Sequence, residues 1–69
     1  MTLESMLQFY RRNLSVNDYL DAREKAIKET SVQEAVMMKI SYTELLNRNY
    51  LRNMIIIYRQ QKRKKERGL

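Results

Sequence analysis

The chain has 69 residues and a formal net charge of +6, and it contains no cysteine, histidine or proline. This composition excludes disulfide bonds and any metal site built on cysteine or histidine. A folded chain of this size buries only about 60% of the surface that its unfolded form exposes. Association with another chain is the remaining common source of stability, and we therefore expect a homodimer.

The scarcity of helix-breaking residues predicts an all-α fold. The one glycine is Gly68, so nothing in the first 67 residues strongly interrupts a helix. We expect a body, residues 1–58, of three to four helices with a long C-terminal helix. Their expected ranges are roughly 3–13, 16–29, 32–39 and 42–58. A hydroxyl residue that suits a helix N-cap precedes each range; these are Thr2, Ser15, Ser31 and Ser41.

The first two helices are predicted to be amphipathic. In each of them, apolar residues recur at helical spacing, and charged residues occupy the other side. The apolar residues are Leu3, Met6, Leu7, Tyr10 and Leu14 in the first helix, and Val16, Tyr19, Leu20, Ala26 and Ile27 in the second. Each helix therefore offers one stripe to a shared core.

The stretch that begins at Val32 allows two interpretations. It forms either one long helix or a short helix that ends at Lys39, a tight turn and a longer helix from Tyr42, and we favour the second. A helix-turn-helix motif over residues 32–48 is a further hypothesis, with Tyr42 to Arg48 as its recognition helix. The match is partial, because Lys39 stands where a small residue is usual and Arg48 where an apolar residue is expected.

The last helix of the body carries apolar residues around much of its circumference. Two short helices cannot easily cover so broad a surface, so we expect this helix to form the centre of the dimer interface. The expected interface residues are Leu46, Tyr50, Leu51, Met54, Ile55, Ile57 and Tyr58.

The excess positive charge is concentrated in a C-terminal tail, residues 59–69, which either continues the last helix or frays. Residues 59–67 hold six basic residues and one acidic residue, a net charge of +5, whereas residues 1–58 hold eight basic and seven acidic residues. Basic and amide side chains are those that contact phosphates and base edges. The candidate nucleic-acid-binding residues are Arg48, Asn49, Arg52, Asn53, Arg59, Lys62, Arg63, Lys64, Lys65 and Arg67.

These observations favour binding over catalysis. The chain lacks a histidine or cysteine for acid–base or nucleophilic work and has no glycine-rich phosphate loop, so we expect neither an enzyme nor a cofactor or metal. We expect a cytoplasmic regulator that binds nucleic acid through its basic tail. The alternative is an adaptor or inhibitor that docks a larger protein through exposed apolar surface. A second, less favoured alternative is adsorption of the tail to an anionic membrane.

Overall fold

The structure, a computed structural model, describes residues 1–67, with side chains described through residue 66. It is all-α, with four helices: α1 (Leu3–Asn13), α2 (Val16–Glu29), α3 (Val32–Met37) and α4 (Tyr42–Arg67). The starts of all four helices agree with the prediction. The expected third helix, 32–39, ends too late, because α3 stops at Met37, and α4 continues through the predicted tail to Arg67. Gly68 and Leu69 lie outside the described residues.

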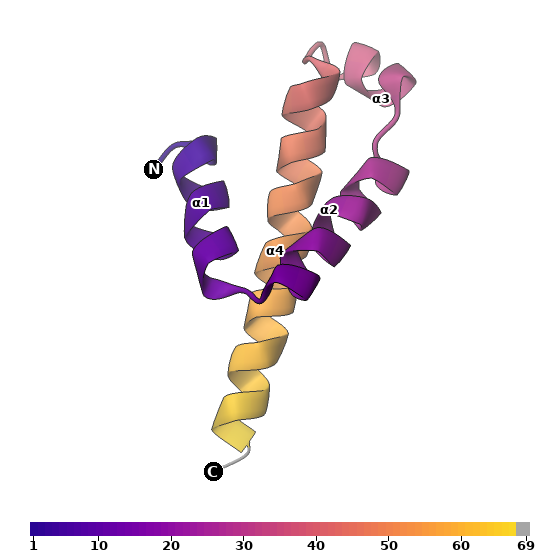
Figure 1. Cartoon of the computed structure of the whole chain (residues 1–69). Coiled ribbons are helices and arrows are strands. Elements are labelled where there is room, and N and C mark those ends of the chain that lie inside the picture. The colour runs from indigo at the N-terminus through magenta and orange to yellow at the C-terminus, as the bar shows by residue number, and fades with distance from the viewer. Residues whose placement is uncertain (68–69) are drawn as a thin grey trace.

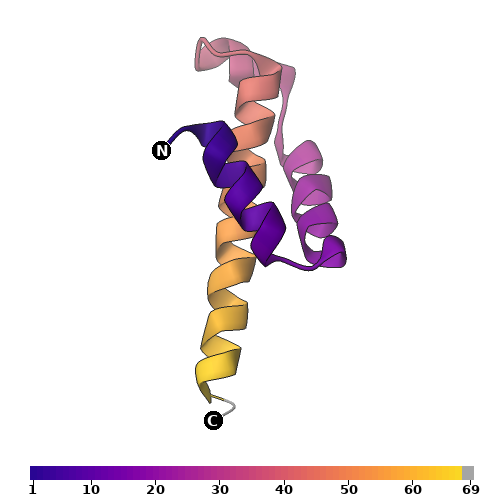
Figure 2. The same ribbon diagram turned by 60° about the vertical axis from the view of Figure 1, so that its left-hand side comes forward.

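The long helix α4 is the centre of the molecule (Figure 1). Helices α1 and α2 pack along its upper and middle parts and join each other at Leu14 and Ser15, while α3 lies beside its start. Figure 2 shows from a second side that the C-terminal part of α4 extends alone beyond the α1–α2 junction. The molecule is accordingly elongated, with extents of 46 × 24 × 18 Å.

Each helix begins with a side-chain cap, as its sequence predicts. A hydroxyl oxygen accepts a hydrogen bond from the backbone N–H three residues later, which satisfies a donor that has no partner within the helix. The four donor–acceptor pairs are Ser5 to Thr2 (3.1 Å), Asp18 to Ser15 (3.3 Å), Glu34 to Ser31 (3.1 Å) and Glu44 to Ser41 (3.1 Å). Removing such a cap typically costs about 1 kcal/mol.

The turn that ends α3 is made without glycine. Lys39 has a φ of 59°, in the left-handed region. Its N–H donates to the carbonyl of Val36 (3.0 Å), and the N–H of Ile40 donates to the carbonyl of Ala35 (3.1 Å). These are the paired hydrogen bonds of a Schellman motif, which stops a helix. A left-handed lysine costs roughly 1–2 kcal/mol, so the contacts around this turn must offset that strain.

The core lies where α2 meets the middle of α4. Ala22 and Ala26 of α2 are completely buried, and their small side chains let the two helices approach closely. Met54 of α4 is also 0% exposed and lies in the same cluster as Leu14, Tyr50 and Leu51. The burial of a methionine among alanines fills the space that their short side chains leave.

Helix α1 is held to α4 by aromatic contacts. The ring of Tyr58 lies 5.5 Å from that of Tyr10 and 6.3 Å from that of Phe9, both in edge-to-face arrangements. Such pairs contribute about 0.5–1.5 kcal/mol beyond the apolar area that they bury. Tyr58 therefore marks the last turn of α4 that α1 covers.

The residues expected at a dimer interface form part of this core within one chain. Tyr50, Leu51 and Met54 are buried, and four others are half-buried against them: Leu46, Ile55, Ile57 and Tyr58. The sequence led us to expect that a second chain buries this apolar surface of α4. In the structure, α1 and α2 of the same chain pack against it. The homodimer itself stays a prediction.

Changing Met54 to alanine should lower the free energy of unfolding by about 2–5 kcal/mol, because it leaves a cavity beneath α2. Ile56→Ala is the matched control, two positions along the same helix, and its side chain is 47% exposed. The control should change the free energy by less than about 1 kcal/mol. Urea unfolding followed by circular dichroism measures both values. Equal losses in the two variants would contradict the position of Met54 in the core.

Candidate nucleic-acid interface

The basic segment is the part of α4 that extends beyond the other helices. We call residues 59–67 of α4 the basic arm. Its five basic residues with described side chains are all exposed; they are Arg59, Lys62, Arg63, Lys64 and Lys65. One hydrogen bond recorded for the described side chains joins the arm to the body, from the Gln61 amide to the carboxylate of Asp18. The side chain of Arg67, also a candidate, lies outside the described residues.

None of the ion pairs recorded for the described side chains joins the arm to an acidic residue of the body. The ion pairs recorded among residues 1–66 join Lys28 to Glu24 (3.6 Å), Arg48 to Glu44 (3.2 Å) and Arg52 to Glu29 (2.6 Å). All three basic partners lie before residue 59. The basic side chains of the arm are therefore exposed to solvent on a helix that is continuous with the body.

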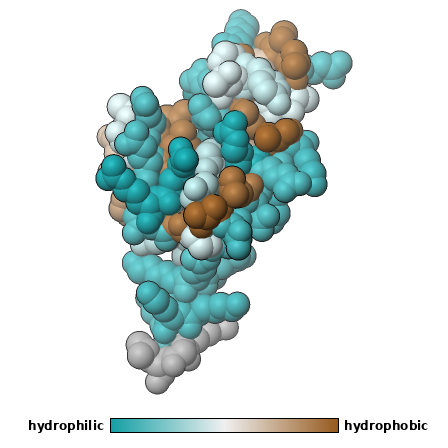
Figure 3. All heavy atoms as spheres, viewed as in Figure 1, coloured by the Kyte–Doolittle hydropathy of each residue, from teal (hydrophilic) through white to brown (hydrophobic). Residues whose placement is uncertain are grey.

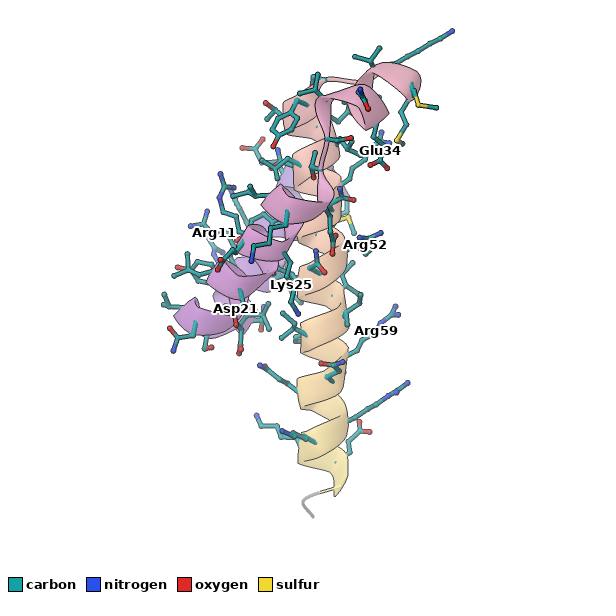
Figure 4. The ribbon with its side chains drawn as sticks, turned by 90° about the vertical axis from the view of Figure 1, so that its right-hand side faces the viewer. Arg11, Asp21, Lys25, Glu34, Arg52 and Arg59 are labelled. Atoms are coloured by element: carbon teal, nitrogen blue, oxygen red, sulfur yellow. The ribbon has the colours of Figure 1, made fainter. Side chains whose placement is uncertain are left out.

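Four arginines form a row along α4. Arg48, Arg52, Arg59 and Arg63 are exposed and follow one another at spacings of four, seven and four, which keeps them on one side of the helix. Figure 4 shows Arg59 on the side of α4 away from α2, whereas the guanidinium of Arg52 contacts Glu29 at the end of α2 (2.6 Å). At about 1.5 Å per residue the row spans about 22 Å. The row continues from the arm onto the body, where Glu44 and Glu29 pair with its two arginines, Arg48 and Arg52.

The predicted amide contacts have a different role in this structure. The Asn49 side chain donates to the hydroxyl of Thr30 (2.9 Å), which itself donates to the carbonyl of Ala26 (2.6 Å). Asn53 is only 8% exposed, and it donates to Glu29 (3.3 Å) and to the carbonyl of Asn49 (2.9 Å). Both amides thus fasten the end of α2 to α4, and the fold uses both N–H donors of the Asn53 amide.

Arg52 belongs to the same connection. Its guanidinium contacts the Glu29 oxygen that also accepts from Asn53. We call Glu29, Thr30, Asn49, Arg52 and Asn53 the polar clamp. Three of the ten predicted contact residues, Asn49, Arg52 and Asn53, make contacts within the clamp. A fourth, Arg48, forms an ion pair with Glu44 on the surface. The interface therefore depends mainly on the basic arm.

A helix-turn-helix motif would bury the positions of Ala35, Ile40 and Leu45. In the structure, Ala35 and Leu45 are buried and Ile40 is half-buried. The helix after the turn, however, is the central helix of the fold, and α1 and α2 cover its middle. The hypothesis therefore concerns only the first turns of α4, and it stays a prediction.

Sequence reasoning missed a second group of basic residues. Arg11 and Arg23 lie near two tyrosines on the side of the body where α1 and α2 meet. Their positions in different helices hid the grouping, because helical periodicity reports only neighbours within one helix. Composition gave no signal either, because residues 3–29 hold three arginines and five acidic residues.

The described residues offer no cluster of three or more histidine, cysteine, aspartate or glutamate side chains that could hold a metal ion. No helix among them has the length and apolar character needed to cross a bilayer. Comparisons of the chain with protein-family models, with curated proteins and with solved structures found no match. The functional argument therefore rests on the chemistry of the surface.

The clamp and the arm should respond differently to substitution. Asn53→Ala should lower the free energy of unfolding by about 1–3 kcal/mol, because it removes a buried amide and both of its hydrogen bonds. Gln60→Ala, an exposed amide on the same helix, is the control and should change it by less than about 0.5 kcal/mol. Arg52→Gln should cost up to about 1 kcal/mol, as expected of an exposed ion pair, and Arg59→Gln almost nothing. Thermal unfolding of the four variants tests this, and a larger loss from Arg59→Gln than from Asn53→Ala would contradict it.

Proposed function

We propose that the protein binds nucleic acid, and that the basic arm supplies the principal contacts to backbone phosphates. The observation that carries the proposal is the continuity of α4, which anchors its middle in the core and extends an exposed, highly basic helix into solvent. An ordered helix presents its charges without the entropic cost that a disordered tail pays on binding. The expected affinity is electrostatic and depends strongly on salt.

The distribution of charge around the arm favours nucleic acid over a membrane surface. At about 100° per residue, Lys62, Arg63, Lys64 and Lys65 point to all sides of the helix. Phosphates that flank a groove can contact opposite sides of a helix, whereas a flat membrane can contact only one. The described arm residues also include no large apolar side chain that could insert into lipid, and this part of the surface is uniformly hydrophilic in Figure 3. A helix about 10–12 Å wide also fits a major groove about 12 Å wide.

A homodimer remains part of the proposal. Two arms on one assembly would raise the local concentration of positive charge and bind one nucleic acid with greater avidity. Exposed apolar residues of α2, namely Val16, Leu20 and Ile27, leave surface on which a second copy could pack.

Docking to a protein is the second candidate function, and one observation favours it. Helix α3 and its C-cap residue expose four apolar side chains, with Met37 the most exposed at 82%; the others are Val32, Val36 and the C-cap Met38. Figure 3 shows apolar surface near α3 at the upper right of the molecule. Methionine adapts well to varied partner surfaces. The segment from Met54 to Tyr58 is a less suitable docking surface, because Met54 is buried in the core.

The three lysines of the arm and the three lysines of the body provide a matched test. Changing Lys62, Lys64 and Lys65 to glutamine removes the same charge as changing Lys25, Lys28 and Lys39. If the arm contacts about five phosphates, log affinity for a short DNA duplex should fall with log salt at a slope of about −4.5 per chain. The arm variant should reduce this slope to about −1.8, and the body variant should leave it nearly unchanged. Fluorescence anisotropy at four salt concentrations measures the slopes.

Equal effects of the two triple variants, or an undetectable interaction with both duplex and single strands, would overturn the proposal. The protein-docking alternative has a separate signature. It expects a stoichiometric complex with a protein that survives nuclease treatment and the loss of the arm lysines, but is weakened by Val36→Gln with Met37→Gln. Loss of the complex on nuclease treatment would favour nucleic acid.

A further inference from the structure

A groove on the body combines two arginines with two tyrosines. It lies where α1 and α2 meet over α4 and is lined by Arg11, Tyr19, Leu20, Arg23 and Tyr50. A neighbouring hollow shares Arg11 and Tyr19 and adds Arg12 and Gln8. Neither lining includes an acidic residue. Figure 4 shows Arg11 on the side of the molecule opposite Arg52 and Arg59, so this groove is separate from the arginine row of α4.

The two arginines are positioned by the tyrosine rings. The guanidinium carbon of Arg11 lies 5.3 Å from the ring centre of Tyr19, and that of Arg23 lies 5.8 Å from the ring centre of Tyr50. Cation–π contact holds a guanidinium while leaving its N–H edge available for a bidentate contact with an oxyanion. The ion pairs recorded among residues 1–66 do not include either arginine.

The Tyr50 hydroxyl supplies a third donor. Tyr50 is only 5% exposed, and no hydrogen bond of its hydroxyl is recorded among the described residues. Every fully buried side-chain polar atom of the described residues has a hydrogen-bond partner. Because the Tyr50 hydroxyl has no recorded partner, it is not fully buried, and Tyr50 reaches the surface where it lines the groove. Burial raises the pKa of Tyr50, although the nearby charges of Arg11 and Arg23 oppose the shift. The phenol therefore stays protonated at neutral pH and can donate.

We propose that this groove binds one phosphate group, carried either by a small phosphate compound or by a nucleic-acid backbone. Two guanidinium groups and one phenol hydroxyl, reaching the groove from three helices, suit the several oxygens of a tetrahedral phosphate, which is a monoanion in a nucleic-acid backbone and approaches a dianion in a small monoester. A planar carboxylate, by contrast, can satisfy only one guanidinium fully. Two like charges in one groove without a carboxylate carry an electrostatic cost, which a bound phosphate would relieve. Where the phosphate belongs to nucleic acid, the inference rests on the proposed function; where it belongs to a small compound, it does not.

Inorganic phosphate is the probe for the site itself. The side-chain Nε–H signals of Arg11 and Arg23, followed by NMR in the full chain, should shift saturably with phosphate. Acetate at equal ionic strength should give no saturable shift. Arg11→Gln with Arg23→Gln should weaken phosphate binding at least about tenfold, whereas Lys25→Gln with Lys28→Gln removes the same charge and should change it less than about twofold. For the arginine variant, the backbone amide signals of Tyr19 and Tyr50 provide the readout.

Tyr50→Phe keeps the ring in the core and removes only the hydroxyl. It should weaken phosphate binding roughly tenfold, as expected for the loss of a hydrogen bond to a charged group. This variant preserves the test if the double arginine variant does not fold. Phosphate shifts that match those of acetate, or that persist unchanged in Tyr50→Phe and in any folded arginine variant, would overturn the proposal.

An oligonucleotide without terminal phosphates then identifies the source of the phosphate. In the variant that lacks the three arm lysines, further weakening by Arg11→Gln with Arg23→Gln would assign the groove to backbone phosphate. An unchanged oligonucleotide affinity, together with a retained response to inorganic phosphate, would assign it to a small phosphate compound. The arm variant should leave the inorganic phosphate response unchanged, so failure of the arm proposal is distinguishable from failure of the groove proposal.

Discussion

The close approach of α2 to α4 is the interaction on which the rest of the structure depends. Ala22 and Ala26 are completely buried against the α4 face that carries Met54, Tyr50 and Leu51. Larger side chains at these two positions would force the helices apart and open the core. With so few buried residues, a chain of this size has little other apolar contact to replace the loss.

This contact also determines where the polar groups of α4 can point. Once α2 lies against α4, the end of α2 places Glu29 and Thr30 beside Asn49, Arg52 and Asn53. The polar clamp then fixes the register of the two helices through directional bonds, which apolar packing alone does not specify. The same packing positions the α1–α2 junction, beyond which α4 becomes the basic arm, joined to the body among the described side chains by the hydrogen bond from Gln61 to Asp18. The core contact thus separates a structural part of α4 from a shorter part available for binding.

Much of this architecture could be predicted from the sequence because it is encoded locally. The caps at Thr2, Ser15, Ser31 and Ser41 and the absence of proline were enough to locate the helix starts. The end of α3 was placed two residues late, because the left-handed conformation of Lys39 contradicts the usual preference for glycine and has no local sequence signal.

Side-chain roles were harder to predict than helix positions. Asn49 and Asn53 resemble readers of base edges by residue type, but their partners lie 19 and 24 residues away, beyond any helical periodicity. For the same reason, the many apolar residues of α4 indicated that this helix is buried on several sides, but they did not show that α1 and α2 bury it. The grouping of Arg11 with Arg23 also depends on how two helices meet, which only the tertiary structure reveals.

The central claim is that α4 consists of a structural part that ends near Tyr58 and a basic arm that the fold does not need. Equilibrium unfolding of residues 1–58, beside the full chain, tests it most directly. The account predicts cooperative unfolding with a free energy within about 1 kcal/mol of the full chain, since truncation removes the exposed last turns of α4 and, among the described side-chain contacts with the body, the hydrogen bond between Gln61 and Asp18. Loss of cooperative unfolding in the shorter chain would show that the arm is part of the structural helix and would contradict the account.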